Sequence, residues 1–425
     1  MPDSSIKIAI IGGGISGLGA ALSLLKVPGV TVNVYEKARE LREIGGGLNV
    51  GPHTRDVLRK LGADSSITGS DMFPILHLKG SNGDLLCTQQ ARRGAPEREH
   101  QRVRRSVLHR ALLANVPEAN IHLNKTLESI TVGNEAGGIV LTFDDDTEIE
   151  ADLVIGADGV RSRVRQYAFP EASIKFIGVT AYRALMPLSQ VARISSFDHR
   201  KTTLWYMPQK GYMYSPIEDN QAGDNKCELV LRELSDPLQL TEAQNIDTPV
   251  PNGVEVDNII VEDTFREFEP AAKALLQCVP KGAWIKYASF AGPPLPSSVK
   301  GNKIVLFGDS ANPMSGAFGS GATFGLQDGW TFGKSLARLL ETGATDPVSK
   351  ALMAFDSIRG PFYQELYKTL GDMKARGQQI AHNEGWEASW IDFANRHYGE
   401  DLNWIYYHDI EQSLNNYFKQ DRIST

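Results

Sequence analysis

A glycine cluster near the start of the chain has the spacing of a phosphate-binding loop. In IGGGISGLGAAL, Gly12, Gly14 and Gly17 follow the β-branched run Ile6–Ile11 and precede an apolar stretch of helical spacing. In a G-x-G-x-x-G loop, the first glycine permits a tight turn, the second lets a pyrophosphate approach the backbone, and the third brings the helix close to the strand. Amide groups at the start of that helix then face the anion. The pattern predicts a dinucleotide site.

A carboxylate follows where a dinucleotide-binding unit needs one. Residues 30–37 are predicted to form a second strand, and Glu36 near its end comes 19 residues after Gly17. A carboxylate there can accept hydrogen bonds from a ribose diol. A glycine-rich turn without a ligand is the alternative, but it does not explain why strand, loop and acid occur together. NAD and FAD both remain open, because proteins that bind either one use this loop.

Two later segments also carry polar residues at strand ends. In VIGADGVRSRVR a strand ends at Asp158, although an Asp-Gly turn alone is common. In IVLFGDSANPMSGAFGSGATFGLQDGW the strand places Asp309 at its carboxyl end, where doubly wound sheets bind ligands. A helix is predicted to begin near Gly321, and amides there can stabilise negative charge on an aromatic cofactor. The glycine spacing of this loop does not fit a second nucleotide fingerprint.

The pattern along the chain predicts two folded bodies. At 425 residues the chain is long for one core. Short alternating strands rich in aromatic residues run from about residue 173 to 290 and predict an inserted, mainly antiparallel sheet. Parallel-strand texture returns at residues 303–309, and the remainder has helical spacing. Acidic residues among the C-terminal aromatics favour packing against the body or a partner subunit over a membrane-surface helix.

Composition argues against several classes of function. A net charge of −7 disfavours a nucleic-acid partner, and no uninterrupted run of 18 apolar residues predicts a membrane span. The three cysteines and the histidines lack metal-ligand spacing, so we expect no metal site. This use of cysteine fits a reducing compartment, and we expect a cytoplasmic protein.

The glycine-bearing segments together resemble those of one enzyme family. Four further segments carry the same resemblance: LREIGGGLNVGPHTRDVLRKLG, RRSVLHRALL, AYRALMP and WIYYHDIE. Over essentially its whole length, the sequence resembles the FAD-dependent aromatic hydroxylases, the single-component flavoprotein monooxygenases typified by salicylate hydroxylase and para-hydroxybenzoate hydroxylase. The resemblance implies an α/β fold like that of para-hydroxybenzoate hydroxylase. The segment WIYYHDIE resembles the salicylate hydroxylase branch. The implied parts are a Rossmann-like FAD-binding domain (1–75, 100–172 and 291–375), an inserted, mainly antiparallel substrate domain (76–99 and 173–290) and a C-terminal helical segment (376–425).

The resemblance assigns cofactor residues position by position. Arg105 and Asp309 would contact the ribityl–pyrophosphate region, and Asp158 would support both FAD and the transient approach of NADH or NADPH. The residues implied to hold the ADP half of FAD are Gly12, Gly14, Ile15, Ser16, Gly17, Glu36 and Lys37. Those implied to lie along the flavin ring are Gly319, Gly321, Ala322 and Thr323 on one side, and residues 45–47, with Gly46 and Gly47 among them, on the other.

The family's chemistry is implied with the cofactor. NAD(P)H would reduce FAD, O2 would add to give a C4a-hydroperoxide, and an aromatic, phenolic or polyketide-like substrate would take one oxygen atom from it. No amino acid side chain activates O2, so the flavin carries that step. The protein must orient the substrate ring, exclude water and help a phenol lose its proton. A homodimer is left open.

Two residues of the inserted sheet are predicted to contact substrate and act in catalysis. Arg183 interrupts an apolar strand in TAYRAL, where a cation can hold a phenolate or a carboxylate and favour its ionised form. An ion pair or a surface position would also explain it. Tyr214 is the candidate hydroxyl, because its strand is expected to face the pocket just before SPI. Tyrosines in such strands are more often plain core.

The loop after Asp309 departs from the family pattern GDAAHPM.P..GQGAN.AIED. Gly316 falls where a proline usually lines the pocket, so the loop gains freedom and loses bulk. The departures leave open epoxidation or Baeyer–Villiger oxidation of a larger natural product, and also a non-catalytic FAD-binding protein. A nicotinamide-only dehydrogenase is a further alternative, but it leaves residues 304–330 unexplained. The departing positions are Asn312, Gly316, Ser320, Thr323 and Gln327.

Overall fold

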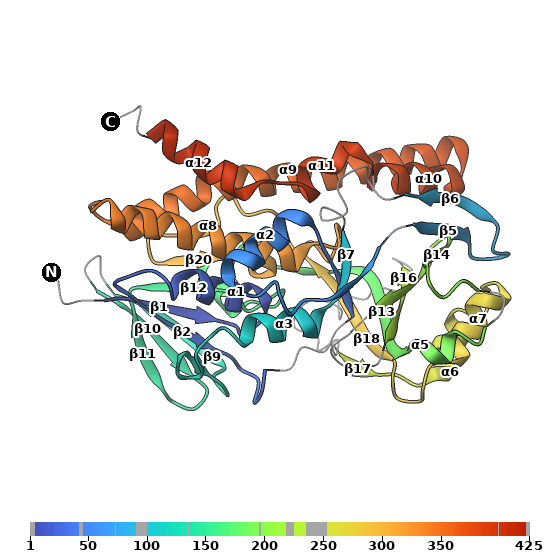
Figure 1. Ribbon diagram of the computed structural model, residues 1–425, viewed down its shortest axis with the longest axis horizontal. Helices are drawn as coiled ribbons and strands as arrows, with labels where there is room; N and C mark the ends of the chain where they lie inside the picture. The colour runs from blue at the N-terminus through green and yellow to red at the C-terminus, as the bar shows by residue number, and fades with distance from the viewer. Residues whose placement is uncertain are drawn as a thin grey trace.

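The fold consists of a parallel sheet and an antiparallel sheet set side by side, with long C-terminal helices running over both (Figure 1). The structure is a computed structural model, and it describes residues 5–41, 46–72, 74–90, 100–133, 137–194, 197–217, 225–234, 253–397 and 399–421. This architecture confirms the predicted α/β class with an inserted, mainly antiparallel sheet.

The parallel sheet has six strands in the order β19-β20-β12-β1-β2-β8. All neighbours are parallel except the edge pair β19–β20. Helices pack on one face and the three-stranded sheet β11-β10-β9 packs on the other, so the central strands are buried on both sides. The strands are β1 (Ile6–Ile11), β2 (Val30–Tyr35), β8 (Ile121–His122), β12 (Leu153–Gly156), β19 (Val299–Lys300) and β20 (Ile304–Leu306), with β9 (Leu127–Val132), β10 (Ile139–Phe143) and β11 (Glu148–Ala151) behind them.

Helices α1 (Ile15–Leu24) and α8 (Gly321–Glu341) approach each other closely over the parallel sheet. Glycines recur at every fourth position of α8 where it meets α1. A Cβ atom at Gly325 would lie 1.9 Å from the Ser16 hydroxyl oxygen, and one at Gly329 would lie 2.7 Å from the Ala20 Cα. The absent side chains therefore bring together the helices that follow the two glycine-rich loops.

The antiparallel sheet has eight strands in the order β17-β18-β13-β16-β15-β14-β5-β6, and only β14 and β5 run parallel. One face is covered by the short helices α5 (Leu188–Val191), α6 (Asn258–Thr264) and α7 (Pro270–Gln277) over an aromatic core. The strands are β5 (Ile75–Lys79), β6 (Leu85–Gln89), β13 (Lys175–Pro187), β14 (Thr202–Met207), β15 (Lys210–Ile217), β16 (Lys226–Leu234), β17 (Val254–Glu255) and β18 (Ile285–Ala291).

A third small sheet joins the two bodies, in the order β3-β7-β4. It consists of β3 (Gly47–Val50), β4 (Gly69–Asp71) and β7 (Gln101–Arg104), and it is flanked by α2 (Pro52–Leu61) and α3 (Arg105–Leu113). Strand β7 runs directly into α3. This connection places the start of α3 at the junction of the two larger sheets (Figure 1).

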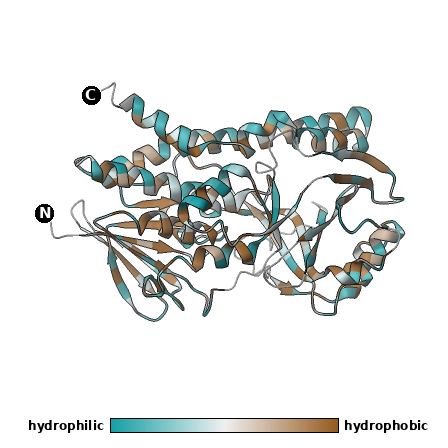
Figure 2. Ribbon diagram, in the orientation of Figure 1, coloured by the Kyte–Doolittle hydropathy of each residue, from teal (hydrophilic) through white to brown (hydrophobic). Residues whose placement is uncertain are grey.

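The C-terminal helices pack against the body, as the sequence favoured. Helix α9 (Pro347–Glu384) lies along α8, and α10 (Trp386–His397) lies against β6. Trp390 of α10 stacks on Tyr206 of the antiparallel sheet with ring centroids 3.9 Å apart. Helix α12 (Ile410–Asp421) returns to α8 and α9. Figure 2 shows that the parallel strands are mainly hydrophobic and that α9 and α10 carry many hydrophilic residues. Within the described ranges, no helix is long and apolar enough to cross a membrane.

Candidate functional site

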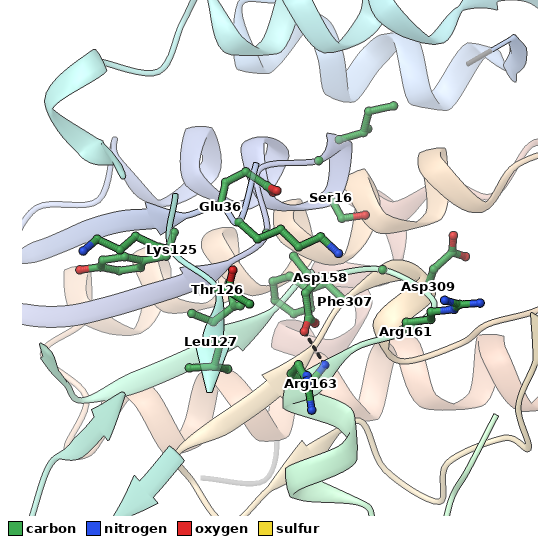
Figure 3. A pocket seen from close by; sticks show the side chains of 18 of the residues that line it. Ser16, Glu36, Lys125, Thr126, Leu127, Asp158, Arg161, Arg163, Phe307 and Asp309 are labelled. Atoms are coloured by element: carbon green, nitrogen blue, oxygen red, sulfur yellow. Dashed lines mark hydrogen bonds between the residues drawn. The ribbon is translucent and has the colours of Figure 1, made fainter. Parts of the chain in front are cut away.

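A groove follows the carboxyl ends of the parallel strands (Figure 3). It extends from the end of β2, across the turn between β1 and α1, to the start of α8. The two glycine-rich loops thus share one crevice, although about 300 residues separate them in sequence. The predicted cofactor residues that line it are Gly12, Gly14, Ile15, Ser16, Glu36, Lys37, Arg105, Asp158, Asp309, Gly321 and Ala322.

The turn after β1 requires its glycines for both conformation and space. Gly12 has a φ of +108°, and a Cβ atom there would lie 2.4 Å from the carbonyl oxygen of Ala157. A Cβ atom at Gly17 would lie 1.9 Å from the carbonyl oxygen of Gly12. Gly17 does not line the groove, so it acts by holding α1 against the turn. Gly14 caps α1 without a side-chain acceptor, which leaves the first amides of the helix available for an anion.

Glu36 lies at the β2 end of the groove and organises the glycine loop. Its carboxylate accepts the Gly13 amide at 2.7 Å through one oxygen and the Ala38 amide at 2.9 Å through the other. The acid therefore fixes the backbone around the site where the ribose was expected. Lys125, Thr126 and Leu127 form the facing wall, which the sequence did not predict.

Asp158 lines the groove, but its carboxylate caps helix α4 (Arg163–Ala168). One oxygen accepts the Ser162 hydroxyl, and the other accepts the amides of Arg163 at 2.7 Å and Val164 at 3.3 Å. Burial raises the pKa of Asp158, while these hydrogen bonds oppose the shift. Its oxygens are thus engaged within the chain. The contribution of Asp158 to the groove is the shape of the turn rather than a free carboxylate.

Asp309 stands in the turn after β20, and its side chain opens into the groove. The residue is exposed overall, yet desolvation by the surrounding protein raises the pKa of its carboxyl. The positive charge of Arg105 opposes the shift. Arg105 begins α3 at the junction of the sheets, and its amide donates to the Gly46 carbonyl at 3.0 Å.

The loop before α8 only partly follows the implied assignment. Gly321 and Ala322 line the groove, whereas Thr323 is buried and its hydroxyl donates to the Ser320 carbonyl at 2.7 Å. Thr323 therefore bonds to the backbone within the first turn of α8. Gly316 has a φ of +72°, which a proline cannot adopt, so the loop takes a path closed to the family's usual residue.

Gly46 and Gly47 are not among the residues that line the groove, and residue 45 lies outside the described ranges. The atoms nearest to their missing side chains belong to Glu228 of β16 and Arg102 of β7. Gly319 likewise sits against Asn49 of β3, where a Cβ atom would lie 2.9 Å from the amide nitrogen. The structure thus places these glycines in contact with protein side chains. They lie beside the end of the groove that Arg105 and Gly321 line, which is called the inner end below.

Arg183 and Tyr214 lie on opposite faces of the antiparallel sheet. Tyr214 is fully buried in the core beneath α5–α7, and its hydroxyl donates to the His199 carbonyl at 2.8 Å. Burial, with the Cys227 thiol beside it, raises its pKa far above the ordinary value. The expected pocket-facing position of Tyr214 is therefore corrected: it faces the core. Arg183 projects from the other face, with its guanidinium carbon 5.9 Å from the centroid of the Tyr287 ring.

Tyr287 of β18 is a candidate that the sequence reasoning missed. Burial raises its pKa, Arg183 and Arg105 lower it, and Glu228 raises it. Tyr287 thus lies beneath the guanidinium of Arg183, and the charges that act on it include the groove-lining Arg105. The sequence did mark this face of the sheet, since Glu228 interrupts the apolar strand CELVL as Arg183 interrupts TAYRAL. It did not mark Tyr287 itself, because the strand of Tyr287 shows no regular alternation of polar and apolar residues.

The comparisons with known proteins agree with this geometry. The family described as an FAD binding domain matches residues 5–223. Salicylate hydroxylase of Pseudomonas putida is 26% identical over 434 residues, covering 96% of this chain and 94% of that one. The 6-hydroxynicotinate 3-monooxygenase of Pseudomonas fluorescens is 24% identical over 412 residues, with 96% of both chains covered. A solved salicylate hydroxylase substrate complex shares the fold, with a TM-score of 0.77 and 21% identity over 97% of this chain and 98% of that one.

The groove fits FAD on its own evidence. Its uncapped helix start can take a pyrophosphate, its two ends are joined along a single crevice, and its glycine turns leave room for close backbone approach. The residues that line the groove can be explained by one dinucleotide-binding fold, without a second one. Together with the match over residues 5–223, these features show that the chain belongs to the FAD-dependent aromatic hydroxylase family and is an FAD-dependent monooxygenase.

Proposed function

We propose that the protein uses NAD(P)H and O2 to insert one oxygen atom into a small aromatic substrate that carries an anionic group. The observation that carries the proposal is the contact between the groove and one face of the antiparallel sheet. The Gly46 carbonyl accepts the amide of the groove-lining Arg105. The adjacent Gly47 amide donates to Glu228, which shares its face of the sheet with Arg183. The inner end of the groove therefore meets the face of the sheet that presents Arg183. That junction is the place for a substrate beside the cofactor.

FAD, when bound, supplies the activation of O2 that no side chain can provide. The amides at the start of α1 hold the pyrophosphate, and the start of α8 lies at the other end of the same groove. Arg183 pairs with no carboxylate within the described part of the chain, so it is available for a phenolate or a carboxylate. A cation there favours the ionised form of a phenol, which is the electron-rich form. The guanidinium lies over the Tyr287 ring, and we infer that the hydroxyl of this tyrosine donates a hydrogen bond to the same group.

Substrate-stimulated oxygen uptake tests this function. The purified protein is expected to be yellow and to release FAD on denaturation. NADH or NADPH consumption should rise with the right member of a panel of hydroxybenzoates and hydroxypyridines, and the product should be one oxygen atom heavier. The names of the relatives suggest this panel. A colourless protein that cannot be reconstituted with FAD would contradict the proposal.

Arg183→Ala is expected to weaken binding of an anionic aromatic ligand by about 10- to 100-fold, the effect of losing one charge-assisted hydrogen bond. FAD content should stay unchanged, because Arg183 lies on the sheet and not in the groove. Ligand affinity is measured by titration of the flavin absorbance. Lys175→Ala, at the exposed start of the same strand, is the matched control and should bind normally. Loss of flavin from the Arg183 variant would show that the residue is structural instead.

A further inference from the structure

Glu228 is a buried carboxylate that joins the antiparallel sheet to the small sheet β3-β7-β4. Its side chain is 0% exposed, and the residues on either side of it in the strand, Cys227 and Leu229, are apolar. Its Oε2 accepts the Gly47 amide at 2.9 Å and the Arg102 Nη2 at 2.6 Å. The residues that donate lie on β3 and β7, whereas Glu228 lies on β16 of the antiparallel sheet. These contacts span 181 and 126 positions of sequence.

The glycine pair at 46–47 is explained by these side chains. A Cβ atom at Gly46 would lie 1.4 Å from Oε1 of Glu228, and a Cβ atom at Gly47 would lie 2.4 Å from Nε of Arg102. Neither contact leaves room for alanine unless the carboxylate or the guanidinium moves. Oε1 has no hydrogen-bond partner among the described residues, which leaves it pressed against Gly46. The close approach therefore serves the contact between the small sheet and the antiparallel sheet.

The segment that Glu228 holds lies at the inner end of the groove. The Gly46 carbonyl accepts the amide of Arg105, which lines the groove. Further along β3, Asn49 accepts Arg102 Nη1 at 3.0 Å and sits against Gly319 of the loop before α8. One carboxylate thus fixes a segment that touches both the start of α3 and the loop that begins α8.

We propose that Glu228 is a positioning residue for the cofactor: with Arg102, it latches segment 46–49 to the antiparallel sheet and so sets the inner end of the groove against FAD. The inference rests on FAD lying along the groove. A buried ion pair of this kind is a weak source of stability, but breaking it by removing one partner leaves an uncompensated charge. Segment 46–49 should then lose its fixed position, while the part of the groove around the turn after β1 should be less affected.

FAD affinity of the Glu228→Gln variant tests the latch. The substitution keeps the shape of the side chain and removes its charge, so we expect the apoprotein to fold and its FAD dissociation constant to rise about tenfold. Affinity is measured by titrating apoprotein into FAD and following flavin fluorescence. Glu233→Gln, on the same strand but packed beside Tyr182 on the other face, is the matched control and should bind like the wild type. An unchanged dissociation constant for Glu228→Gln would overturn the proposal.

Two combinations separate positioning from a general loss of structure. If Glu228 and Arg102 act as one latch, adding Arg102→Gln to Glu228→Gln should weaken FAD no further than the worse single change. Effects that multiply would overturn the proposal. Gly46→Ala should weaken FAD when Glu228 is present and have little further effect in the Glu228→Ala background, since the clash is then removed. Equal penalties in both backgrounds would also overturn it.

Hydrogen exchange tests the latch without any substitution. In wild-type apoprotein, the Gly47 amide is expected to exchange slowly because it donates to a buried carboxylate. Exchange at the rate of an unstructured peptide would overturn the proposal. This result is independent of FAD, so a wild-type protein that binds no flavin would defeat the proposed function while leaving the latch to be judged by exchange.

Discussion

Arg359→Leu is expected to lower the free energy of unfolding by about 3–5 kcal/mol, because it removes one partner of a fully buried ion pair. The Nε of Arg359 donates to Asp328 Oδ1 at 2.7 Å, and both residues have at most 1% exposure. Asp328 Oδ2 also accepts the Gly308 amide at 2.8 Å and the Tyr363 hydroxyl at 2.7 Å. Without the guanidinium, this carboxylate would remain buried with only two neutral donors.

The measurement is denaturant unfolding of the apoprotein, with Arg376→Leu as the control. Arg376 makes an ion pair of the same length with Asp392, also 2.7 Å, but its side chain is 51% exposed. An exposed pair contributes at most about 1 kcal/mol, so the control should unfold close to the wild type. Similar midpoints for the two variants would contradict the assignment. The Arg359 variant should also lose FAD, because Asp328 fixes the Gly308 amide next to the groove-lining Asp309.

The parts of the fold that local rules determine could be predicted from the sequence. The turn after β1 and the turn after β20 each follow a short apolar strand and precede a helix, and parallel strands place their carboxyl ends at one edge of the sheet. Once β1 and β20 belong to one sheet, that rule brings Gly12 and Asp309 to one groove. The turns and helix starts themselves follow from local preferences of strands, turns and helix ends.

The faces of the antiparallel strands could not be predicted in the same way. A strand with one solvated face alternates polar and apolar residues, but β15 is covered on both sides and gives no such alternation. Tyr214 and Tyr287 then look equivalent in sequence, although a register shift of one residue in either strand would turn its tyrosine to the opposite face of the sheet. The structure buries Tyr214 in the core and leaves Tyr287 beside Arg183.

Side chains that meet across the fold also escape prediction. The GGG of residues 45–47 has the appearance of a cofactor loop, yet the atoms that require Gly46 and Gly47 belong to Glu228 and Arg102. A glycine shows that something approaches the backbone closely, but not what approaches. A ligand and a distant side chain leave the same mark in a sequence. Here the pairing of β16 with its neighbours in the antiparallel sheet decides between the two, because it fixes the face on which Glu228 lies.

Gly17→Ala is expected to cost about 4 kcal/mol or more and to abolish FAD binding. Its Cβ atom would lie 1.9 Å from the carbonyl oxygen of Gly12, a backbone atom that cannot rotate away as a side chain would. Relief requires α1 to move from β1, but α8 packs on the far side of α1 through its own glycines. Movement of α1 would also carry its uncapped amides away from the pyrophosphate position. Thermal unfolding and flavin content of the purified variant measure both effects.

Gly371→Ala is the matched control for that change. Gly371 lies inside α9, and a Cβ atom there would meet nothing within 4 Å. Alanine is favoured over glycine in a helix interior by about 1 kcal/mol, so this variant should unfold at a slightly higher temperature and keep its flavin. The same methyl group is thus expected to stabilise one helix and to disrupt another. A Gly17 variant that binds FAD like the Gly371 variant would show that the contact between α1 and the β1 turn is not what holds the phosphate site together.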